Sequence, residues 1–542
     1  MEKKQQKHPF FKKVRNYFKE YCNNTSIHGF KYFGENRSYF ERGWWFVVFV
    51  LSLTACFFAI SMVYQKWIKS PVIVTFATME TPVYTIPFPA VTICPESKSM
   101  QPVYSHEEIL KSFINNETLT EDELRNLKYM GLICDRDRDI QYPDNEFVTD
   151  EIYDVFNNLS AGQPFYECNF MGQDLDCNKV FVPIFTDEGV CYTFNSANRS
   201  DIFRDNVYQH YDFLNAERNI SDNWNIEEGY SKSAGLETYP RRALLAGVNN
   251  ALTVTLISTF LDEDQTCKGG IHGYKVSIHL PTRLPRSSQE YFRVPNNEIV
   301  IAGINPNMIK TSSRLRNYDV KKRNCYFSYE KHLKFFKIYT PKTCKLECQT
   351  NFTLYYCGCV AFFMPRENST NICGLGNYEC MNYAETQFQL FSLRHLNTSQ
   401  NNSYITQKTW PNERKFFPGD LPICDCLPMC SDLTYLVETS QSKWDWFNAE
   451  SKHYKNNSIP INRDMIKFST LIIFFKSSEF IFSERNELYG PLDFLANFGG
   501  LLGLFTGFSL LSLMEAFYFL TLRMFCNARM YGNWSGKNNY VN

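Results

Sequence analysis

GWWFVVFVLSLTACFFAISMVYQ, residues 43–65, is a run of 23 residues without a charged side chain. A helix of this length is about 35 Å long, which is enough to cross the roughly 30 Å hydrocarbon core of a bilayer. A signal sequence has a shorter apolar segment nearer the first residue, and a soluble core helix carries polar residues on one face. The stretch therefore predicts a membrane-spanning helix, which we assign to residues 43–66.

A second apolar stretch, Asp493–Leu522, lies close to the other end of the chain. Asp493 and Glu515 enclose 21 uncharged residues. As one helix, residues 494–522 would be about 43 Å long, so the segment must tilt, protrude or break. The mean hydropathy of the whole chain is −0.34, so most of the remaining residues must lie in water. The sequence predicts two spans that flank a large water-exposed region.

Flanking charge predicts the orientation of both spans. Residues 1–42 carry ten Lys or Arg against four Glu, and the tail after residue 522 carries Arg523, Arg529 and Lys537 without an acid. Cytoplasmic flanks are enriched in Lys and Arg, so both termini are expected in the cytoplasm. The predicted parts are a cytoplasmic N-terminus (1–42), the first span (43–66), an extracellular domain (67–489), the second span and pore (490–522) and a cytoplasmic C-terminus (523–542).

The distribution of cysteines agrees with this topology. The chain has 19 cysteines, and 16 of them lie between Cys94 and Cys430. An even number in an extracellular region is typical of disulfides. The same region holds nine Asn-x-Ser/Thr sequons, which predict a glycosylated domain: Asn116, Asn158, Asn198, Asn219, Asn351, Asn368, Asn397, Asn401 and Asn456.

The extracellular region is expected to mix helices and strands. Residue patterns favour helices at 107–115, 121–130 and 343–351, and strands at 88–94, 251–257 and 471–475. The fold class is therefore an integral membrane α+β protein, in which two transmembrane helices flank a disulfide-rich mixed domain.

Cysteine spacing gives one more local prediction. Cys344 and Cys348 would share one helix face, whereas Cys424 and Cys426 alternate along an extended segment. A helix pinned to an extended partner by stacked disulfides fits this spacing. A zinc site is the alternative, but zinc clusters favour C-x₂₋₄-C pairs and a reducing compartment. Spacing alone leaves the pairing of the cysteines open.

Composition argues against several function classes. The net charge of −1 gives no basic surface bias toward nucleic acid. The sequence has no metal-ligand cluster and no nucleophile motif. We therefore expect no enzyme activity, no bound metal, no cofactor and no nucleic-acid partner.

Five segments in order resemble the degenerin/epithelial sodium channel family, which includes the acid-sensing channels. They are Ser26-Ile27-His28-Gly29 before the first span, FPAVTICP at 88–95, Cys191-Tyr192-Thr193-Phe194-Asn195, ten cysteines between Cys325 and Cys430, and GGLLGLFTGFS at 499–509. The stretches 323–348 and 424–430 resemble the insect pickpocket branch of this family.

The resemblance implies a disulfide pattern. The ladder at 325–430 would form the family's thumb, and Cys134 and Cys267, which the family pattern leaves over, are expected to pair with each other. The implied pairs are Cys325–Cys430, Cys344–Cys426, Cys348–Cys424, Cys357–Cys380, Cys359–Cys373, Cys94–Cys191, Cys168–Cys177 and Cys134–Cys267.

The second apolar stretch carries a pattern of small residues. Gly499, Gly503 and Gly507 recur every four residues, which lets helix backbones approach closely. By itself this pattern also fits an ordinary dimerising single-pass helix. Ser512 adds a hydroxyl, and an acid such as Glu515 within a membrane costs about 2.5 kcal/mol or more unless it faces water or a partner. A cation pathway would supply both water and a partner for this carboxylate.

The resemblance also implies roles for individual residues. Gly507, Phe508 and Ser509 would form a broken, non-helical selectivity filter, with Gly503 at an amiloride-sensitive position and His28-Gly29 in a re-entrant cytoplasmic loop. The implied assembly is a homo- or heterotrimer in the lipid of the plasma membrane, with Na⁺ as permeant ion and amiloride as blocker. The expected pore and gate residues are Ala496, Asn497, Gly499, Gly500, Gly503, Ser512 and Glu515.

Three departures from the family pattern modify these expectations. Phe508 is bulky at the middle of the filter, and we expect its side chain to face away from the lumen. Asn497 stands where acid-sensing relatives carry an acid, so attraction of cations at the outer mouth is expected to be weaker. No Trp directly precedes Cys325, which argues against proton gating; the sequence does not identify the stimulus.

Other functional classes remain as alternatives. An ATP-gated two-span channel would need clustered basic residues for phosphates, and no convincing set is present. A non-conducting receptor or adhesion subunit would not need the glycine stripe together with Glu515. An ectoenzyme is disfavoured by the absence of a catalytic motif.

Overall fold

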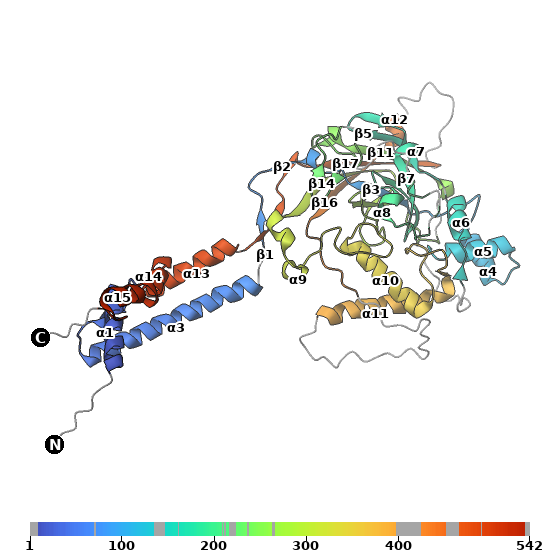
Figure 1. Cartoon of the computed structure of the whole chain (residues 1–542). Helices are drawn as coiled ribbons and strands as arrows, with labels where there is room; N and C mark the ends of the chain where they lie inside the picture. The colour runs from blue at the N-terminus through green and yellow to red at the C-terminus, as the bar shows by residue number, and fades with distance from the viewer. Residues whose placement is uncertain are drawn as a thin grey trace, which may run out of the picture. The chain divides into compact units, whose positions relative to one another are not determined.

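The computed structural model describes residues 9–69, 72–134, 147–160, 162–208, 210, 213–215, 224–235, 238–262, 266–396, 424–450, 465–488 and 490–536. The chain divides into two compact units (Figure 1). The helical unit comprises Met1–Val74, Arg314–Tyr318 and Asn486–Asn542. The disulfide-rich unit comprises Thr75–Ser313 and Asp319–Arg485.

The helical unit is built around one long apolar helix. Helix α3, Tyr39–Lys69, has 31 residues and extends beyond the predicted span at both ends. Only 6% of its most apolar window is buried within the chain, whereas the core helix of a soluble protein would be mostly covered. The other helices of this unit are α1 (Pro9–Asn24), α2 (Lys31–Gly34), α13 (Pro491–Thr506), α14 (Leu510–Leu520) and α15 (Leu522–Tyr531).

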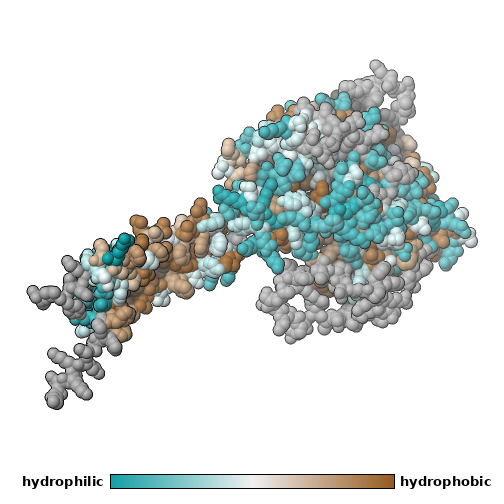
Figure 2. Space-filling view, viewed as in Figure 1, coloured by the Kyte–Doolittle hydropathy of each residue, from teal (hydrophilic) through white to brown (hydrophobic). Residues whose placement is uncertain are grey.

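The surface of the helical unit is hydrophobic along its length. Figure 2 shows hydrophobic side chains over the visible face of α3 and α13. Phe57 on α3 is 75% exposed and Leu504 on α13 is 78% exposed. Contiguous exposed apolar surface of this kind marks contact with lipid or other protein chains.

The second apolar stretch is broken. Among the described helices, α3 alone is long and apolar enough to cross a membrane by itself. Pro491–Thr506 and Leu510–Tyr531 satisfy the same criteria only together, as two arms bent by 70°. The expectation that the overlong segment cannot continue as one straight helix is therefore confirmed.

The larger sheet of the disulfide-rich fold has eight strands. Its order is β1-β19-β14-β17-β11-β5-β6, and β16 pairs with β14. Strand β14 runs parallel to β17 and antiparallel to β16. The bounds are β1 (Val72–Phe76), β5 (Phe165–Phe170), β6 (Gln173–Leu175), β11 (Leu252–Thr259), β14 (Glu298–Thr311), β16 (Asp432–Lys443), β17 (Ile466–Phe475) and β19 (Ser483–Glu487).

A second sheet of five strands shares a core with the first. Its order is β13-β12-β3-β8-β7. Phe88 and Val91 lie in one buried cluster with Leu252, Val254 and Ile473 of the larger sheet. The three segments expected as strands are thus all strands of one core. The bounds are β3 (Ala90–Pro95), β7 (Phe181–Thr186), β8 (Gly189–Phe194), β12 (Tyr274–His279) and β13 (Phe292–Val294).

Asn195, at the end of the C-Y-T-F-N segment, has a structural role. Its backbone takes a positive φ of 57°, which Asn tolerates better than most residues. Its side-chain Nδ2 donates to the Phe88 carbonyl oxygen (2.6 Å), and its Oδ1 accepts from the Arg241 N–H (2.7 Å). The side chain therefore ties the end of β8 to the segment before β3.

Helices surround these sheets, and all three predicted helical patches are helical. Helix α5 begins with a capping box in which Thr120 and Glu123 bond each other's backbone N–H. The longer helices are α4 (His106–Ile114), α5 (Glu121–Met130), α6 (Glu151–Leu159), α10 (Pro341–Cys357) and α11 (Tyr378–Leu396). The short elements are α7 (Cys177–Val180), α8 (Arg199–Ile202), α9 (Val320–Arg323), α12 (Trp446–Glu450), β2 (Thr81–Pro82), β4 (Phe147–Val148), β9 (Trp224–Asn225), β10 (Gly229–Tyr230), β15 (Ile372–Cys373) and β18 (Glu479–Phe480).

Eight disulfides cross-link the unit. Cys344 and Cys348 lie on α10 and bond to Cys426 and Cys424 of a segment outside any regular strand. The remaining bonds are Cys94–Cys191, Cys134–Cys267, Cys168–Cys177, Cys325–Cys430, Cys357–Cys380 and Cys359–Cys373. These are the pairs that the resemblance implied, including the extra bridge, and they exclude the zinc alternative because the thiols are used.

The predicted glycosylation sites differ in their surroundings. Asn116, Asn158 and Asn368 are exposed, whereas Asn198 is half-buried. Asn351 is half-buried on α10, and the hydroxyl of its sequon, on the buried Thr353, donates to the Gln349 carbonyl. Four further predicted sites lie outside the described residues: Asn219, Asn397, Asn401 and Asn456.

Candidate functional site

The break in the second apolar segment lies at Gly507-Phe508-Ser509. Helix α13 ends at Thr506, and Gly507 follows with a left-handed φ of 67°, which glycine adopts at little cost. Ser509 then caps α14, because its hydroxyl accepts from the Ser512 N–H at 3.2 Å. The residue types therefore define both ends of the break, at the position that the resemblance implied.

Backbone carbonyls around the break have two different environments. The Phe505 carbonyl accepts from the Ser52 hydroxyl of α3 (2.6 Å), and the Thr506 carbonyl accepts from the His28 N–H (2.9 Å). Within the described part of the chain, no hydrogen bond reaches the carbonyl oxygens of Gly507 or Phe508. Unpaired carbonyls at membrane depth are tolerated where they line a water-filled cavity, in which they can bind a cation.

His28 packs directly against the break. It belongs to the turn between α1 and α2, where Gly29 has a φ of 87°. A Cβ placed on Gly507 would lie 2.7 Å from the His28 ring, so the imidazole occupies the space that glycine leaves. The two residues of the His-Gly motif therefore belong to the same site as the proposed filter.

A hydroxyl and carboxylate network joins this N-terminal turn to α14. The Ser26 backbone N–H and hydroxyl donate to Oε2 of Glu515 at 3.0 and 3.1 Å. The Ser26 and Ser512 hydroxyls are 2.7 Å apart, and Ser512 is fully buried. The Ser512 hydroxyl also accepts from the Ser509 N–H at 3.2 Å, so the network ends at the filter segment.

The network changes the interpretation of Glu515. An acid at this position was expected to face water or a partner, and the partner of one of its oxygens is Ser26 of the N-terminal turn. Sequence reasoning also missed Ser26 and Ser52 as contributors to the site. The only available signal for Ser26 was a hydroxyl residue next to the His-Gly motif, and such a signal is not specific.

Helix α1 is anchored to α14 and α15. The Tyr17 hydroxyl donates to the Phe519 carbonyl oxygen, and Glu20 forms an ion pair with Arg523. The Tyr21 and Phe519 rings meet edge to face, with centroids 5.3 Å apart. Residues of α1, α14 and α15 therefore form one packed cluster.

The N-terminal part of α13 carries the predicted gate residues. Phe494 packs on Trp67 of α3, with ring centroids 4.9 Å apart. In contrast, Ala496 is exposed, and a Cβ on Gly499 or Gly500 would meet no atom within 4 Å. The chain's own described residues therefore leave this small-residue surface uncovered.

Two more predicted residues lie on α13: the Asn497 amide donates to the Asp493 carbonyl (2.9 Å), and Gly503 lies near the Phe508 carbonyl.

The fold and this site agree with a comparison to known families. Residues 21–519 match the model of the family described as "Amiloride-sensitive sodium channel". The chain belongs to this family, the degenerin/epithelial sodium channels, and is a cation channel subunit rather than an enzyme.

Individual relatives come from insects and fish. Pickpocket protein 28 of Drosophila melanogaster is 27% identical over 524 residues, covering 94% of this chain and 79% of that protein. Sodium channel protein Nach of the same species is 22% identical, with coverages of 95% and 88%. Acid-sensing ion channel 1C of Danio rerio is 21% identical, with coverages of 92% and 82%.

We predict that Glu515→Gln lowers single-channel conductance and weakens block by divalent cations, because it removes a negative charge beside the proposed ion path. Ser26→Ala should produce part of the same change, since it removes one donor to this carboxylate. The double variant should show less than the sum of both effects, as expected for residues in direct contact. Single-channel recording measures all three.

The matched control is Ser38→Ala, which removes another hydroxyl of the helical unit, one that accepts from the Glu41 N–H. This variant should conduct normally. Unchanged conductance in Glu515→Gln would place its carboxylate outside the ion path.

Proposed function

We propose that the chain is a subunit of a trimeric, sodium-selective and amiloride-sensitive channel of the plasma membrane that is opened through its extracellular domain. It would have two spans and both termini in the cytoplasm. The observation that carries the proposal is the helix break at Gly507–Ser509, where two backbone carbonyls lie without partners among the described residues.

The broken helix supports a second span that lines a pore. Helix α13 has 16 residues, or about 24 Å, and is too short to cross the hydrocarbon core alone. A span completed by α14 places the break at membrane depth. Non-helical backbone is tolerated there only where it is buried in protein or lines a water-filled cavity.

The uncovered surface of α13 supports assembly of several copies. Two spans cannot enclose a pore, so other subunits must contribute helices. Small residues such as Ala496, Gly499 and Gly500 allow the close helix contacts that drive association in membranes. The number of three, with identical or related subunits, comes from the resemblance to the family.

Conduction would depend on the carbonyl oxygens of the filter. The carbonyls of Gly507 and Phe508 can replace water around a cation, and the Ser509 segment forms the other side of the break. The printed names of the family and of the relative Nach favour Na⁺ as the ion and amiloride as the blocker. Gly503, one turn before the break, is the proposed amiloride-sensitive position.

The disulfide ladder supports a role of the extracellular domain in gating. In the entropy model, each long loop closed by a disulfide stabilises the fold by about 3–5 kcal/mol. Helix α10 is pinned at Cys344 and Cys348, which makes it a stiff element able to transmit force. In the chain, β1 directly follows the first span and β19 closely precedes the second, so movement of the sheet would reach both.

We expect Ser509→Leu to reduce sodium current or to admit potassium. The substitution places a larger side chain at the filter and removes the cap of α14, which is worth about 1 kcal/mol. Ser509→Thr retains a capping hydroxyl and is the matched control. Reversal potentials under exchange of sodium for potassium measure the permeability ratio, and an unchanged ratio with normal current would remove Ser509 from the filter.

Voltage-clamp recording of the full chain tests the function as a whole. The chain should be expressed alone and with related subunits, in sodium and then in a large impermeant cation, with and without amiloride. Inward current that disappears on sodium replacement and on amiloride supports the proposal. Potassium-selective or anion current at verified surface expression would overturn it.

A further inference from the structure

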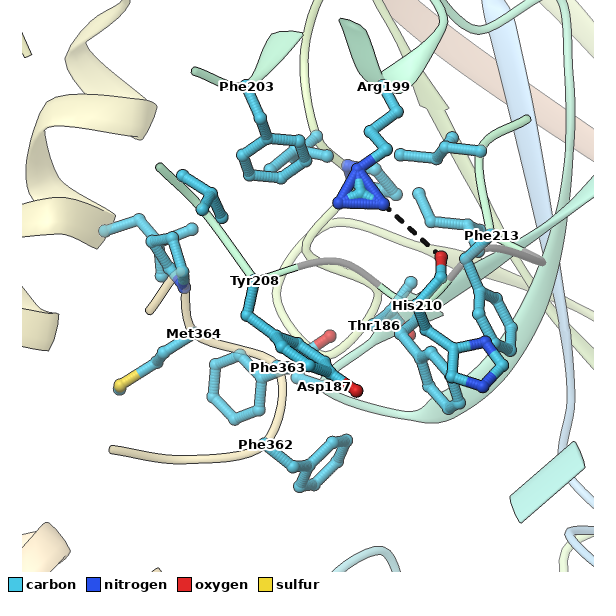
Figure 3. A pocket seen from close by; sticks show the side chains of 18 of the residues that line it. Thr186, Asp187, Arg199, Phe203, Tyr208, His210, Phe213, Phe362, Phe363 and Met364 are labelled. Atoms are coloured by element: carbon cyan, nitrogen blue, oxygen red, sulfur yellow. Dashed lines mark hydrogen bonds between the residues drawn. The ribbon is translucent and has the colours of Figure 1, made fainter. Parts of the chain in front are cut away.

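The disulfide-rich unit contains a cavity, whereas the residues of the proposed pore belong to the helical unit. The cavity has a volume of about 120 Å³, and it is lined by the β7–β8 hairpin, by residues within 199–208, by residues 210 and 213–214, by residues 284–286 and by α10 with the segment after it. This volume is somewhat smaller than the roughly 150 Å³ of a cavity that binds benzene, so the space takes no more than one small ring or a short aliphatic body. Figure 3 shows the side chains that line it.

Aromatic side chains form a large part of the lining. Seven Phe and Tyr rings line the space, and the Phe185 and Phe213 rings pack against each other with centroids 3.8 Å apart. The Arg366 guanidinium packs over the Tyr208 ring, 3.9 Å from the ring centre, and holds this side chain in place. Such walls favour an apolar, flat ligand. The rings labelled in Figure 3 are Phe203, Tyr208, Phe213, Phe362 and Phe363.

Arg199 brings a positive charge into this apolar space. Figure 3 shows its guanidinium among the rings, with one bond to the His210 carbonyl. That bond, from Nη1, is 3.3 Å long, whereas Nε is buried without a hydrogen-bond partner. Among the described residues, no carboxylate forms an ion pair with Arg199. Burial lowers the pKa of Arg199 to about 10, and no carboxylate among the described residues stabilises its positive charge.

The other charges around the cavity are paired. Asp187 accepts from the Ser288 hydroxyl and lies 3.4 Å from Nε of Arg286, so these two charges cancel. His210 Nε2 forms a hydrogen bond with an oxygen of Asp154, 3.0 Å away. Of the Asp and Arg side chains that line the cavity, Arg199 is therefore the one without an ion pair among the described residues.

Arg199 is half-buried, and its Nε is buried without a hydrogen-bond partner, which is costly. A carboxylate is the group that matches the two-pronged geometry of a guanidinium. We propose that this cavity binds a small organic monoanion, an aromatic monocarboxylate, whose carboxylate pairs with Arg199 and whose ring lies among the aromatic side chains. Asp187 Oδ1, which is buried without a hydrogen-bond partner, can accept from a hydroxyl of such a ligand. The site is independent of the ion selectivity proposed above.

Binding of 4-fluorobenzoate to the full chain in detergent, followed by ¹⁹F NMR, tests the proposal. Benzoate should compete for the same site. The neutral 4-fluorobenzamide should bind at least tenfold more weakly, and the cationic 4-fluorobenzylamine should not bind. This series uses the unmodified protein, so it does not depend on the folding of any variant.

Arg199→Met should weaken benzoate binding at least tenfold while preserving the bulk of the side chain. The matched control is Arg125→Met, which removes an exposed guanidinium on α5 whose ion pair is with Asp122; this variant should bind benzoate normally. Arg199→Met should unfold at the same or a higher temperature than the unmodified chain, because it removes a half-buried charge that has no ion pair among the described residues. Benzoate should raise the unfolding temperatures of the unmodified chain and of Arg125→Met, but not that of Arg199→Met.

Three results would overturn the proposal. They are a lack of benzoate binding to the unmodified chain, equal affinities for the benzoate and the benzamide, and equal affinities of the unmodified chain and Arg199→Met. Displacement of the benzoate by sodium chloride, with the same rise in unfolding temperature from chloride alone, would show that the site takes an inorganic anion instead.

Discussion

Gly507→Ala should reduce amiloride-sensitive current about tenfold or more at unchanged surface expression. Gly507 has a φ of 67°, and an L-residue in that region costs about 1–2 kcal/mol. The new Cβ would also lie 2.7 Å from the His28 ring. The His28 backbone is held by its bond to the Thr506 carbonyl, so either the ring must rotate or the N-terminal turn must leave the break.

Gly532→Ala separates these two causes. Gly532 has a φ of 63°, but a Cβ there would meet no atom within 4 Å. This control therefore carries the backbone strain without the clash and should leave the current nearly normal. Whole-cell current, normalised to surface labelling, measures both variants. Equal losses in both would show that contact with His28 is not the reason for the effect.

Ala496→Phe should produce standing, amiloride-sensitive sodium current without a stimulus, and Ala496→Val should do so to a smaller extent. Ala496 is exposed on α13 and is followed by Gly499 and Gly500, which meet no side chain of the described residues. In the proposed trimer, these small residues are where neighbouring helices converge when the pore is closed. Overpacking such a contact costs about 1–3 kcal/mol. If the open state relieves the clash, the ratio of open to closed channels would rise on the order of 5- to 150-fold.

The matched control is Ala55→Phe, which enlarges an exposed alanine of α3. Its side chain lies on the first span and should not open the pore. Recording without a stimulus, before and after amiloride, distinguishes the variants. An Ala496→Phe channel that reaches the surface and stays silent would show that this part of α13 does not form the closed gate.

Local residue patterns predicted much of the fold. Residues 43–65 are apolar throughout, so the first helix follows from chain chemistry alone, although its ends lie at Tyr39 and Lys69. The position of the break at Gly507–Ser509 was implied by the family resemblance, and the residue types explain it, because glycine takes a left-handed φ and serine caps helices. The disulfide pairs became predictable only through family resemblance, since spacing permits many pairings.

Other parts of the sites could not be predicted because they join residues far apart in the sequence. Ser26 meets Ser512 and Glu515 across more than 480 positions. No periodicity or motif encodes such a contact; it follows from the path of the N-terminal turn. The aromatic side chains around Arg199 could not be predicted for the same reason, because they come from several separate segments of the chain.

The sequence by itself determined the two apolar stretches and the oxidising surroundings of sixteen cysteines, because each depends on the residue types within one part of the chain. The tertiary structure alone decided that the Glu515 carboxylate holds the N-terminal turn and that Arg199 lacks a counter-ion among the described residues. Both depend on which side chains approach within a few ångströms. Packing sets these distances, and residue identity alone leaves them open.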